Sequence, residues 1–312
     1  MRVYKRGNKW YYDIYTDSGK RIRKVVAPGD LDRALALELA ESKTVLTIES
    51  FVDEYLSEIS PHVSKLTISA YRKSLESFSS FIGNMALHDI TSRHISRYAS
   101  WRLGKSIKPE TVNSDLRHLR AAFNKALKWE YINKPLSIDM VKASKRLPRH
   151  LSVDQVSMIL EAETNTDFKR LWIFLVWTGC RRGEALGLTW EDVSLGDRPQ
   201  ALITGKGDRQ RVVPLLPPAV EALGEPGQGR VFPDWAPFSV SQHFRRLVRT
   251  LGIHARVHDL RHTCLTWLVG KGVPLKLVQD IAGHSSINTT MLYAKVYSGE
   301  SYDTLSKAFG FS

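Results

Sequence analysis

The pattern of apolar and polar positions divides the chain into a short β-rich beginning and a long helical remainder. Residues 10–15 alternate between two faces, with Trp10, Tyr12 and Ile14 on one of them, which is the period-two pattern of a strand. Turn residues at 17–19 lead to a second strand over 20–26, and residues 3–5 can add a third. A short acidic helix over 31–41 is expected to pack on this sheet.

Helical periodicity dominates from about residue 46 to residue 135. Apolar side chains recur every three or four positions in the segments 47–59, 66–82, 91–103 and 111–131. Gly83 stands where the second of these helices would end, and an Asn-Lys-Pro run at 133–135 ends the set. The pattern therefore predicts an all-helical bundle.

The remaining residues predict a larger unit, mainly helical with a small antiparallel sheet. Ser152 and Gln155 form a capping box, the apolar run 171–177 indicates a buried helix, and further helices are expected over 239–251, 259–269 and 274–282. Strands over 200–204 and 211–215 flank a Gly-Lys-Gly-Asp turn. The predicted fold class is multidomain α+β: a small β-sheet unit with its helix (1–45), a helical bundle (46–141), a basic linker (142–149) and the large domain (150–312).

The net charge of the chain indicates a class of binding partner. The 312 residues carry a formal net charge of +13, and the first 25 residues contain eight Lys or Arg but only two Asp. Such an excess favours a polyanion, although a basic protein without a nucleic-acid role remains possible. Each basic side chain can also be an ordinary solvated surface group. The candidates for DNA contact are Lys5, Arg6, Lys20, Arg21, Arg117, Arg120, Lys142, Lys145, Arg146, Arg209 and Arg211.

Cysteine content and hydropathy indicate the cellular compartment in which the protein is expected. The two cysteines, Cys180 and Cys264, leave no disulfide framework and no cysteine-based zinc site, which fits a reducing cytoplasm. The N-terminus lacks an apolar signal region, and the longest strongly apolar run, 171–177, is too short to cross a bilayer. We therefore expect a cytoplasmic protein without a membrane partner.

Candidate chemistry begins with His-x-x-Arg, a motif so short that chance supplies it. It occurs at His94/Arg97, His243/Arg246 and His258/Arg261. The first two pairs are most simply helix-surface residues. The third pair is accompanied elsewhere in the chain by further residues that suit the same chemistry. Arg181 follows a Gly turn and has Glu184 three positions later. Lys206 stands at the tip of a Gly-flanked hairpin, His284 follows a Gly, and Tyr293 comes late in the chain. Taken singly, these are a surface ion pair, a loop lysine and a core tyrosine.

Taken in order, the residues resemble the tyrosine recombinase (phage integrase) family. Four segments match its motifs: TGCRRGEALGL at 178–188, GKGDRQRVVPL at 205–215, HDLRHT at 258–263 and GHSSINTTMLYAK at 283–295. The resemblance covers residues 150–300 and extends more loosely over 46–135, which is similar to the family's helical core-binding domain. Cys180, where an aliphatic residue is common, and Arg209, where Lys is common, depart from the pattern without removing a catalytic group.

The resemblance implies an enzyme that cleaves and rejoins DNA. Arg181 and Arg261 would grip the non-bridging oxygens of the scissile phosphate with fixed donor forks, as Lys could not. Their effect would be to stabilise charge at the pentavalent transition state. Glu184 would orient Arg181.

Proton transfer and nucleophilic attack fall to the remaining motif residues. Tyr293 would be the nucleophile that holds DNA as a 3′-phosphotyrosine, with Tyr297 and Tyr302 as less suitably spaced rivals. Lys206 would be the general acid for the departing 5′-oxygen. His258 would assist proton transfer from the tyrosine or hydrogen-bond a phosphate oxygen, and His284 would be a second hydrogen-bond donor to the phosphate. Because the phosphotyrosine conserves the bond energy, rejoining would need no ATP. The sequence shows no carboxylate cluster for Mg²⁺, and the two arginines would make a metal unnecessary, so no cofactor is expected.

The N-terminal unit refines the interpretation within the family. Chromosome-dimer resolvases generally lack a small basic β unit, whereas phage and genomic-island integrases often use one to bind arm-type DNA sites. The resemblance then implies double-stranded DNA with core-type and arm-type sites as partner, a homotetramer in a synapse that passes through a Holliday junction, and a DNA-bending host factor and an excisionase as accessory partners. Residues 305–309 of the C-terminal segment would dock on a neighbouring protomer or pack on their own domain.

Two other classes stay open on the sequence. A non-catalytic regulator would use residues 260–282 as a helix-turn-helix, which explains the charge but leaves Arg181, Lys206 and Tyr293 without roles. A type IB topoisomerase-like enzyme would share the chemistry but act without site preference or tetramer assembly. Covalent capture of DNA separates the first from an integrase, and site preference separates the second.

Overall fold

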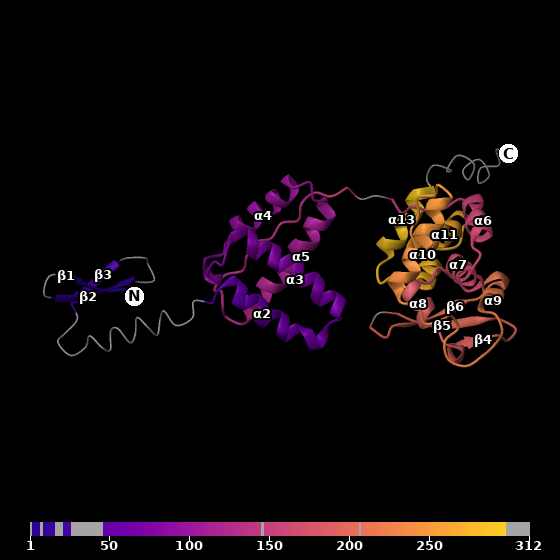
Figure 1. Ribbon diagram of the computed structural model, residues 1–312, viewed down its shortest axis with the longest axis horizontal. Coiled ribbons are helices and arrows are strands. Elements are labelled where there is room, and N and C mark those ends of the chain that lie inside the picture. Colours follow the sequence, from indigo (N-terminus) through magenta and orange to yellow (C-terminus); the bar gives the residue numbers. More distant parts are fainter. Residues whose placement is uncertain are drawn as a thin grey trace. The chain divides into compact units, whose positions relative to one another are not determined.

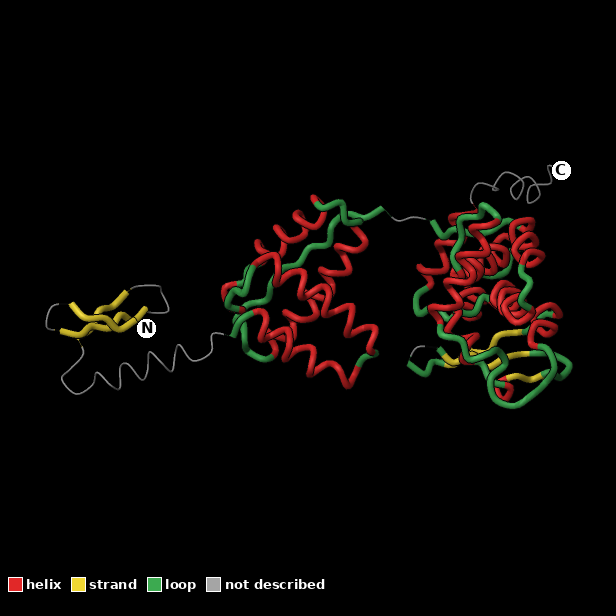
Figure 2. The backbone as a smooth tube through the Cα atoms, viewed as in Figure 1, coloured by secondary structure: helices red, strands yellow, loops and turns green. Residues whose placement is uncertain are grey.

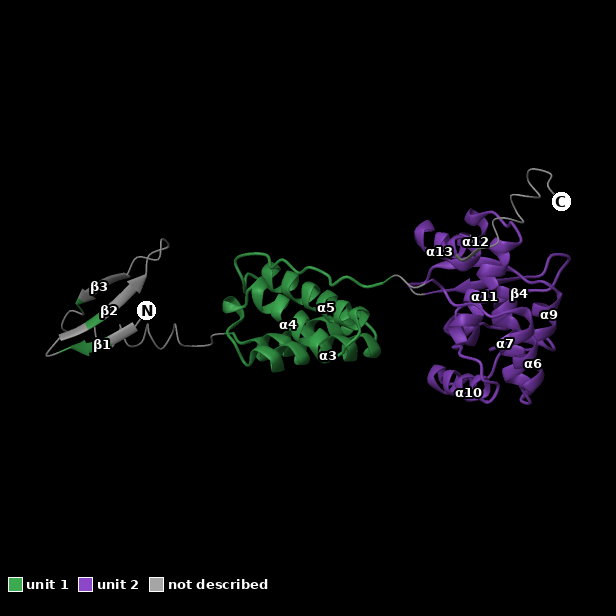
Figure 3. Cartoon of the chain, turned by 90° about the horizontal axis from the view of Figure 1, so that it is seen from above, with its two compact units in different colours: residues 1–144 green, residues 145–312 purple. Residues whose placement is uncertain are grey.

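The structure, a computed structural model, describes residues 2–6, 9–15, 21–25, 46–144, 147–205 and 207–297. Its residues fall into two compact units, 1–144 and 145–312 (Figure 3). The predicted boundary at residue 45 lies inside the first unit and stays a prediction. The helix expected over 31–41, the C-terminal segment from 298 and four candidate site residues lie outside the described residues: Lys20, Lys145, Arg146 and Lys206.

The first unit contains the predicted three-stranded sheet. Strands β1 (Arg2–Arg6), β2 (Lys9–Tyr15) and β3 (Arg21–Val25) are antiparallel in the order β1-β2-β3 (Figure 2). Tyr4 pairs with Tyr11, and their rings stack with centroids 6.0 Å apart. The guanidinium of Arg23 lies 5.6 Å from the ring centroid of Tyr4. The period-two interpretation of residues 10–15 is therefore confirmed.

The four predicted bundle helices are present, with ends shifted by at most three residues. They are α2 (Ile48–Ile59), α3 (Lys65–Ile82), α4 (Ser92–Gly104) and α5 (Pro109–Lys128), joined by short 3-10 turns at Ser60–His62 and Leu87–Asp89 (Figure 1). The hydroxyls of Thr47 and Ser64 cap α2 and α3 by accepting backbone N–H groups. Phe51, Phe78 and Leu119 are fully buried and form the centre of the core.

A segment beyond the fourth helix also belongs to this unit. Helix α5 ends at Lys128, but Ile138 is still buried in the bundle core. The amide of Asn113 holds the backbone of Val141 from both sides, donating to its carbonyl at 2.9 Å and accepting from its N–H at 2.8 Å. The guanidinium of Arg120 donates to the carbonyl of Ile138. Arg120, a candidate DNA contact, thus also fastens this segment to α5.

The second unit is helical around a three-stranded sheet, as predicted. Its helices are α6 (Val153–Ala162), α7 (Thr166–Thr178), α8 (Arg182–Gly187), α9 (Pro217–Leu223), α10 (Pro237–Thr250), α11 (Val257–Gly270), α12 (Leu275–Ala282) and α13 (Ile287–Tyr297). A 3-10 turn (Trp190–Asp192) leads into β4 (Val193–Ser194), which pairs with β5 (Gln200–Thr204), and β5 pairs with β6 (Gln210–Pro214). The strand β4 and the helices α8, α9 and α13 were not expected from the sequence.

Helix α7 lies at the centre of the second unit, with α9 and α11 packed against it. Its side chains Trp172 and Phe174 are completely buried, and the indole of Trp172 donates to the carboxylate of Glu163 at 3.0 Å. The same carboxylate lies 2.7 Å from Nε2 of His243, whose ring stacks on Phe168 at 3.8 Å. His243, expected on a helix surface, is therefore part of this packing. Among the described residues, no helix is long and apolar enough to cross a membrane.

Candidate active site

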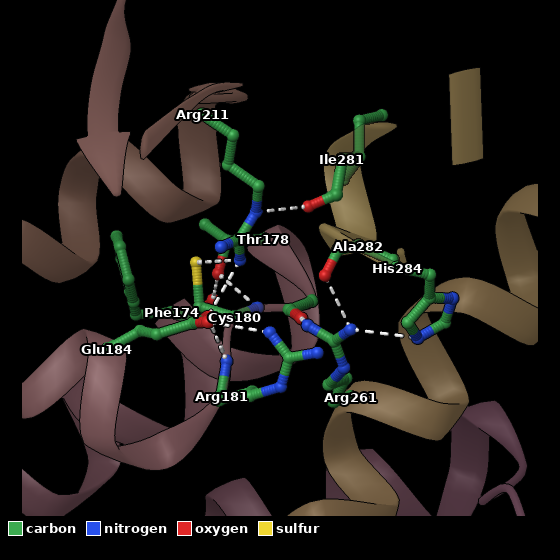
Figure 4. Close-up of polar contacts among 11 residues, drawn as sticks. Phe174, Thr178, Cys180, Arg181, Glu184, Arg211, Arg261, Ile281, Ala282 and His284 are labelled. Atoms are coloured by element: carbon green, nitrogen blue, oxygen red, sulfur yellow. Dashed lines mark hydrogen bonds and ion pairs between the residues drawn. The ribbon is translucent and has the colours of Figure 1, made fainter. Parts of the chain in front are cut away.

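The candidate site is centred on Arg261, which is buried inside the second unit. Its guanidinium donates at 2.6 Å to the carbonyl of Gly179, after α7, and at 2.6 Å to the carbonyl of Ala282, at the end of α12 (Figure 4). Burial lowers the pKa of Arg261 to about 10, and the charge of Arg181 acts in the same direction. A buried guanidinium is tolerated when hydrogen bonds satisfy it. These bonds also hold three distant chain segments together at one point.

Arg181 belongs to the same site and lies in the turn between α7 and α8. Gly179 ends α7 in the left-handed conformation, with φ of 65°, and Arg181 is the residue that precedes α8. Its guanidinium donates to Glu184 at 2.8 Å, and its backbone N–H donates to the other carboxylate oxygen, also at 2.8 Å. The sequence predicted that Glu184 orients Arg181; the carboxylate is buried, so this contact is not the surface ion pair that was the alternative.

A third arginine, Arg211 on β6, completes this arrangement. It donates to Glu184 at 2.7 Å and to the carbonyl of Ile281 on α12 at 2.7 Å, and its side chain is only 11% exposed (Figure 4). The sequence proposed Arg211 as a DNA contact. Two nitrogens of its guanidinium bond Glu184 and the end of α12 inside the domain, and a contact between Arg211 and DNA stays a prediction. By contrast, the side chain of Arg209, two residues earlier in the same hairpin, is exposed.

Glu184 is held in its charged form, so its contribution to stability depends on pH. Burial raises its pKa, but hydrogen bonds from Arg211 and Arg181 outweigh that effect and bring the pKa to about 2 from 4.5. Because the folded pKa is depressed, the stabilisation is complete above pH 4.5 and is lost as pH falls toward 2. A shift of this size corresponds to about 3 kcal/mol.

We therefore predict that Glu184→Gln removes a pH-dependent part of the folding free energy. In urea unfolding between pH 2 and 6, the deficit of Glu184→Gln relative to wild type should be largest at pH 6 and shrink as pH falls below 4.5. Glu221→Gln, which alters an exposed carboxylate on α9, is the matched control and should leave stability unchanged. A deficit for Glu184→Gln that stays constant across this range would contradict the prediction.

Gly283 is required where α12 ends beside Arg211. Its φ is +63°, and a Cβ placed on it would lie 3.0 Å from Cδ and 3.2 Å from Nε of Arg211. We predict that Gly283→Ala lowers the free energy of unfolding by about 1–3 kcal/mol, because the left-handed conformation and the contact both penalise a side chain. Gly187→Ala, at a glycine with nothing within 4 Å of the added Cβ, should leave it nearly unchanged in the same urea titration. Equal losses would refute this explanation.

Helix α13 brings Tyr293 to the cluster from the C-terminal side. Its side chain is 2% exposed and packs with Leu265, Val278 and Ala282 of α11 and α12. Burial raises the pKa of Tyr293, and the nearby charges of Arg261 and Arg181 act in the opposite direction. Tyr297 is the last residue of the same helix, and Tyr302 lies outside the described residues. The hydroxyl of Tyr293 therefore lies in this cluster.

Two histidines contact Tyr293, and a third packs against one of them. The hydroxyl of Tyr293 lies 2.7 Å from Nδ1 of His262, and the ring of His284 stacks parallel to the tyrosine ring with centroids 6.1 Å apart. His284 Nε2 accepts from Arg261 at 3.0 Å, which leaves Nδ1 to donate to the hydroxyl of Thr290 at 2.9 Å. His258 packs edge-on against His262, with ring centroids 4.6 Å apart.

A cationic hollow of about 360 Å³ opens beside His258. Its lining includes Arg181, Arg182, Arg245, Arg256 and His258. Partial burial and then the charge of Arg261 lower the pKa of His258. Four guanidinium groups around one opening form a site suited to an anion such as a phosphate.

The structure brings together five of the six residues predicted to be catalytic, and the sixth, Lys206, lies outside the described residues. Sequence reasoning did not assign roles to His262 or Thr290, nor the internal role of Arg211. A signal for His262 was present, because it follows His258 by four residues and so shares its helix face. Thr290 carried no such signal, since the helix that positions it was not expected. Lys5, Arg6, Arg117 and Lys142 are exposed, and Arg21 lies on β3.

Comparison with known proteins agrees with this geometry. Residues 149–300 match the phage integrase family, and residues 47–140 match the phage integrase SAM-like domain. A lambda integrase dimer bound to a COC′ core site has a similar fold, with a TM-score of 0.66 over 93% of each chain at 18% identity. The recombinase XerH bound to a difH substrate gives a TM-score of 0.63 over 77% of this chain and 79% of XerH, at 24% identity.

Curated relatives extend the likeness over nearly their whole length. Tyrosine recombinase XerC of Alcanivorax borkumensis is 30% identical over 297 residues, covering 82% of this chain and 94% of XerC. A putative integrase of Pseudomonas phage Pf1 is 30% identical over 314 residues, covering 94% of this chain and 92% of the phage protein. With the motif residues gathered around one tyrosine, these matches establish that the chain belongs to the tyrosine recombinase (phage integrase) family and is a site-specific recombinase.

Proposed function

We propose that this chain is the integrase of a phage or another mobile element, which cleaves and rejoins attachment-site DNA through a 3′-phosphotyrosine. The observation that carries the proposal is that His262 and His284 contact Tyr293 within one unit, while His258 packs on His262 and the charges of Arg261 and Arg181 act on the tyrosine. Attack by the phenolic oxygen forms an O–P bond, and the 5′-oxygen leaves. The phosphodiester energy stays in the phosphotyrosine, so the 5′-hydroxyl of another strand can reverse the step without ATP.

Two arginines would stabilise the negative charge that develops on the phosphate. Arg181 has a side chain that is 43% exposed and lies at the cationic hollow, so its free donors can reach a bound phosphate. Arg261 is more deeply placed, and an entering anion would compete for its bond to His284. Two positioned cations stabilise the pentavalent transition state more than the ground state.

Three side chains serve proton transfer and hydrogen bonding. Lys206 gives a proton to the 5′-oxygen as it leaves. His258, at the hollow beside Arg181, hydrogen-bonds a non-bridging oxygen. Burial and the charges of Arg261 and Arg181 lower the pKa of His284 to about 4; a phosphate beside it opposes those charges and favours the protonated, donating form.

Double-stranded DNA is the proposed partner, bound by a tetramer at the crossover. Solved relatives include a lambda integrase dimer on a COC′ core site and a lambda integrase tetramer on a Holliday junction. The net charge of +13 favours the same partner. We propose that residues 46–141 and 150–312 clamp core-type sites, joined by the basic linker 142–149. A DNA-bending host factor and an excisionase are the accessory proteins expected on a bacterial chromosome.

The first 45 residues are proposed to bind separate arm-type sites. The match to the phage Pf1 protein covers 94% of this chain, so about 19 of 312 residues lie outside it and most of residues 1–45 lie within it. The match to XerC covers 82%. Lys5 and Arg6 on β1 are exposed on the sheet that would meet the DNA. This difference in coverage favours a mobile-element integrase over a chromosome-dimer resolvase.

Covalent trapping tests the proposal. Nicked duplexes that tile the DNA beside the gene would be incubated with the protein without metal or ATP and resolved on a denaturing gel. We expect a protein–DNA adduct on a small set of tiles that share one core sequence. Binding at low salt without an adduct on any tile would favour a non-catalytic regulator, and adducts on every tile would favour a relaxing enzyme of the topoisomerase IB type.

A further inference from the structure

The hydroxyl of Tyr293 has one hydrogen-bond partner among the described residues, His262, which lies inside the HDLRHT segment but was not among the residues predicted to be catalytic. Nδ1 of His262 lies 2.7 Å from the phenolic oxygen. Burial lowers the pKa of His262 to about 4, and the neighbouring His258 acts in the same direction, so the ring is neutral at pH 7. A neutral Nδ1 without a proton is an acceptor, and a phenol is the natural donor. The bond therefore runs from Tyr293 to His262, with the imidazole proton on Nε2.

The other two histidines are engaged elsewhere. His284 lies parallel to the tyrosine ring, but its two nitrogens bond Arg261 and Thr290. His258 contacts the ring of His262 and lines the cationic hollow. Of the three imidazoles, that of His262 is the one placed to receive a proton from the nucleophile without any rearrangement.

We propose that His262 is a further catalytic residue, the base that accepts the phenolic proton of Tyr293 during attack on the scissile phosphate. This inference rests on the proposed function. As the phenolic oxygen forms its bond to phosphorus, its proton passes to Nδ1 of His262, while the bond from phosphorus to the 5′-oxygen breaks and that oxygen takes a proton from the general acid. In the rejoining step His262 returns the proton to Tyr293. Atoms and charge balance in both directions.

The surroundings of Tyr293 explain why a base is needed. The side chain is 2% exposed, and burial raises its pKa, so the phenolate is scarce before reaction. The proton must therefore leave as the oxygen attacks. The observed 2.7 Å lies within the range required of a general base, and such transfer contributes about 10²–10⁴-fold. Negative charge that develops on the phosphoryl oxygens favours the imidazolium, so His262 becomes more basic as the reaction proceeds.

A side chain that only holds Tyr293 in place must be distinguished from one that takes its proton. His262→Asn offers an amide oxygen close to the position of Nδ1, which can accept the same hydrogen bond but cannot take up a proton at neutral pH. A fluorinated tyrosine at position 293 has a more acidic phenol and needs a base less. Acidity should therefore restore a variant that lacks the base, but it should not restore one in which the nucleophile is misplaced.

The experiment measures single-turnover adduct formation on a nicked core-site duplex at saturating protein. We expect His262→Asn to slow adduct formation about 10²-fold or more, and fluorotyrosine at position 293 to restore at least tenfold of that loss while changing the wild-type rate little. His254→Asn, at an exposed histidine between α10 and α11, is the matched control and should react as wild type. His262→Gln, which keeps an acceptor on a longer side chain, replaces His262→Asn if the latter does not unfold cooperatively.

The outcomes separate the inference from the function on which it rests. A wild-type rate in the His262 variant, or an equal fluorotyrosine effect in variant and wild type, would refute the role of His262 and leave the recombinase intact. Absence of an adduct with wild-type protein on every duplex would instead overturn the proposed covalent chemistry. Recovery by fluorotyrosine in the His262 variant alone supports both.

Discussion

Tyr293→Phe is expected to abolish covalent capture of DNA while leaving DNA binding and folding almost unchanged. The variant lacks the one oxygen that can bond to phosphorus, so no adduct should be detected on nicked core-site duplexes even after prolonged incubation. The phenyl ring keeps the packing against Leu265, Val278 and Ala282. Loss of the bond to His262 should cost only about 1 kcal/mol of stability. Denaturing gels measure the adduct, and mobility shifts measure binding.

Tyr297→Phe is the matched control for this prediction. Tyr297 lies on the same helix, one turn later, and its variant should form the adduct at the wild-type rate. An adduct that persists in Tyr293→Phe and disappears in Tyr297→Phe would show that the nucleophile was misassigned. Loss of DNA binding in Tyr293→Phe would show that the ring is needed for more than its oxygen.

Arg181→Lys is expected to slow cleavage about 10²–10³-fold at saturating protein. Lysine keeps the charge but lacks the planar fork that can bind a carboxylate and a phosphate oxygen together. Arg181 has a side chain that is 43% exposed, so the change should leave the domain folded. Single-turnover cleavage rates, with thermal unfolding of the same samples, measure the two effects separately.

A neutral scissile linkage provides the control for Arg181. A methylphosphonate lacks one anionic oxygen, so an enzyme with Arg181→Lys should lose much less of its rate on this substrate than on the phosphodiester. Arg230→Lys, at an arginine that pairs with the exposed Asp234, is the matched variant and should cleave as wild type. An equal loss for Arg181→Lys on both substrates would mean that Arg181 acts through structure rather than through charge on the phosphate.

Local physical rules explain which elements the sequence predicted correctly. The strands of residues 2–25 and the helices of the bundle follow from period-two and period-3.6 patterns with caps such as Thr47, Ser64 and Gly83. Helix α13 was missed because its residues show little separation of apolar and polar faces, and its stability comes from packing on α11 and α12. The predicted bundle boundary at 141 includes Ile138, but the sequence did not predict how this segment packs, because an extended segment has no pattern of its own.

The sequence by itself determined the family and the identity of the motif residues, because order, residue type and spacing are properties of the chain alone. Tertiary structure decided how those residues are used. Glu184 is a buried bridge between Arg181 and Arg211, not a surface partner of one of them, since β6 approaches the α7–α8 turn only in the folded domain. His262 meets Tyr293 across 31 positions of sequence. Contacts over such separations depend on how helices pack, which no local pattern encodes.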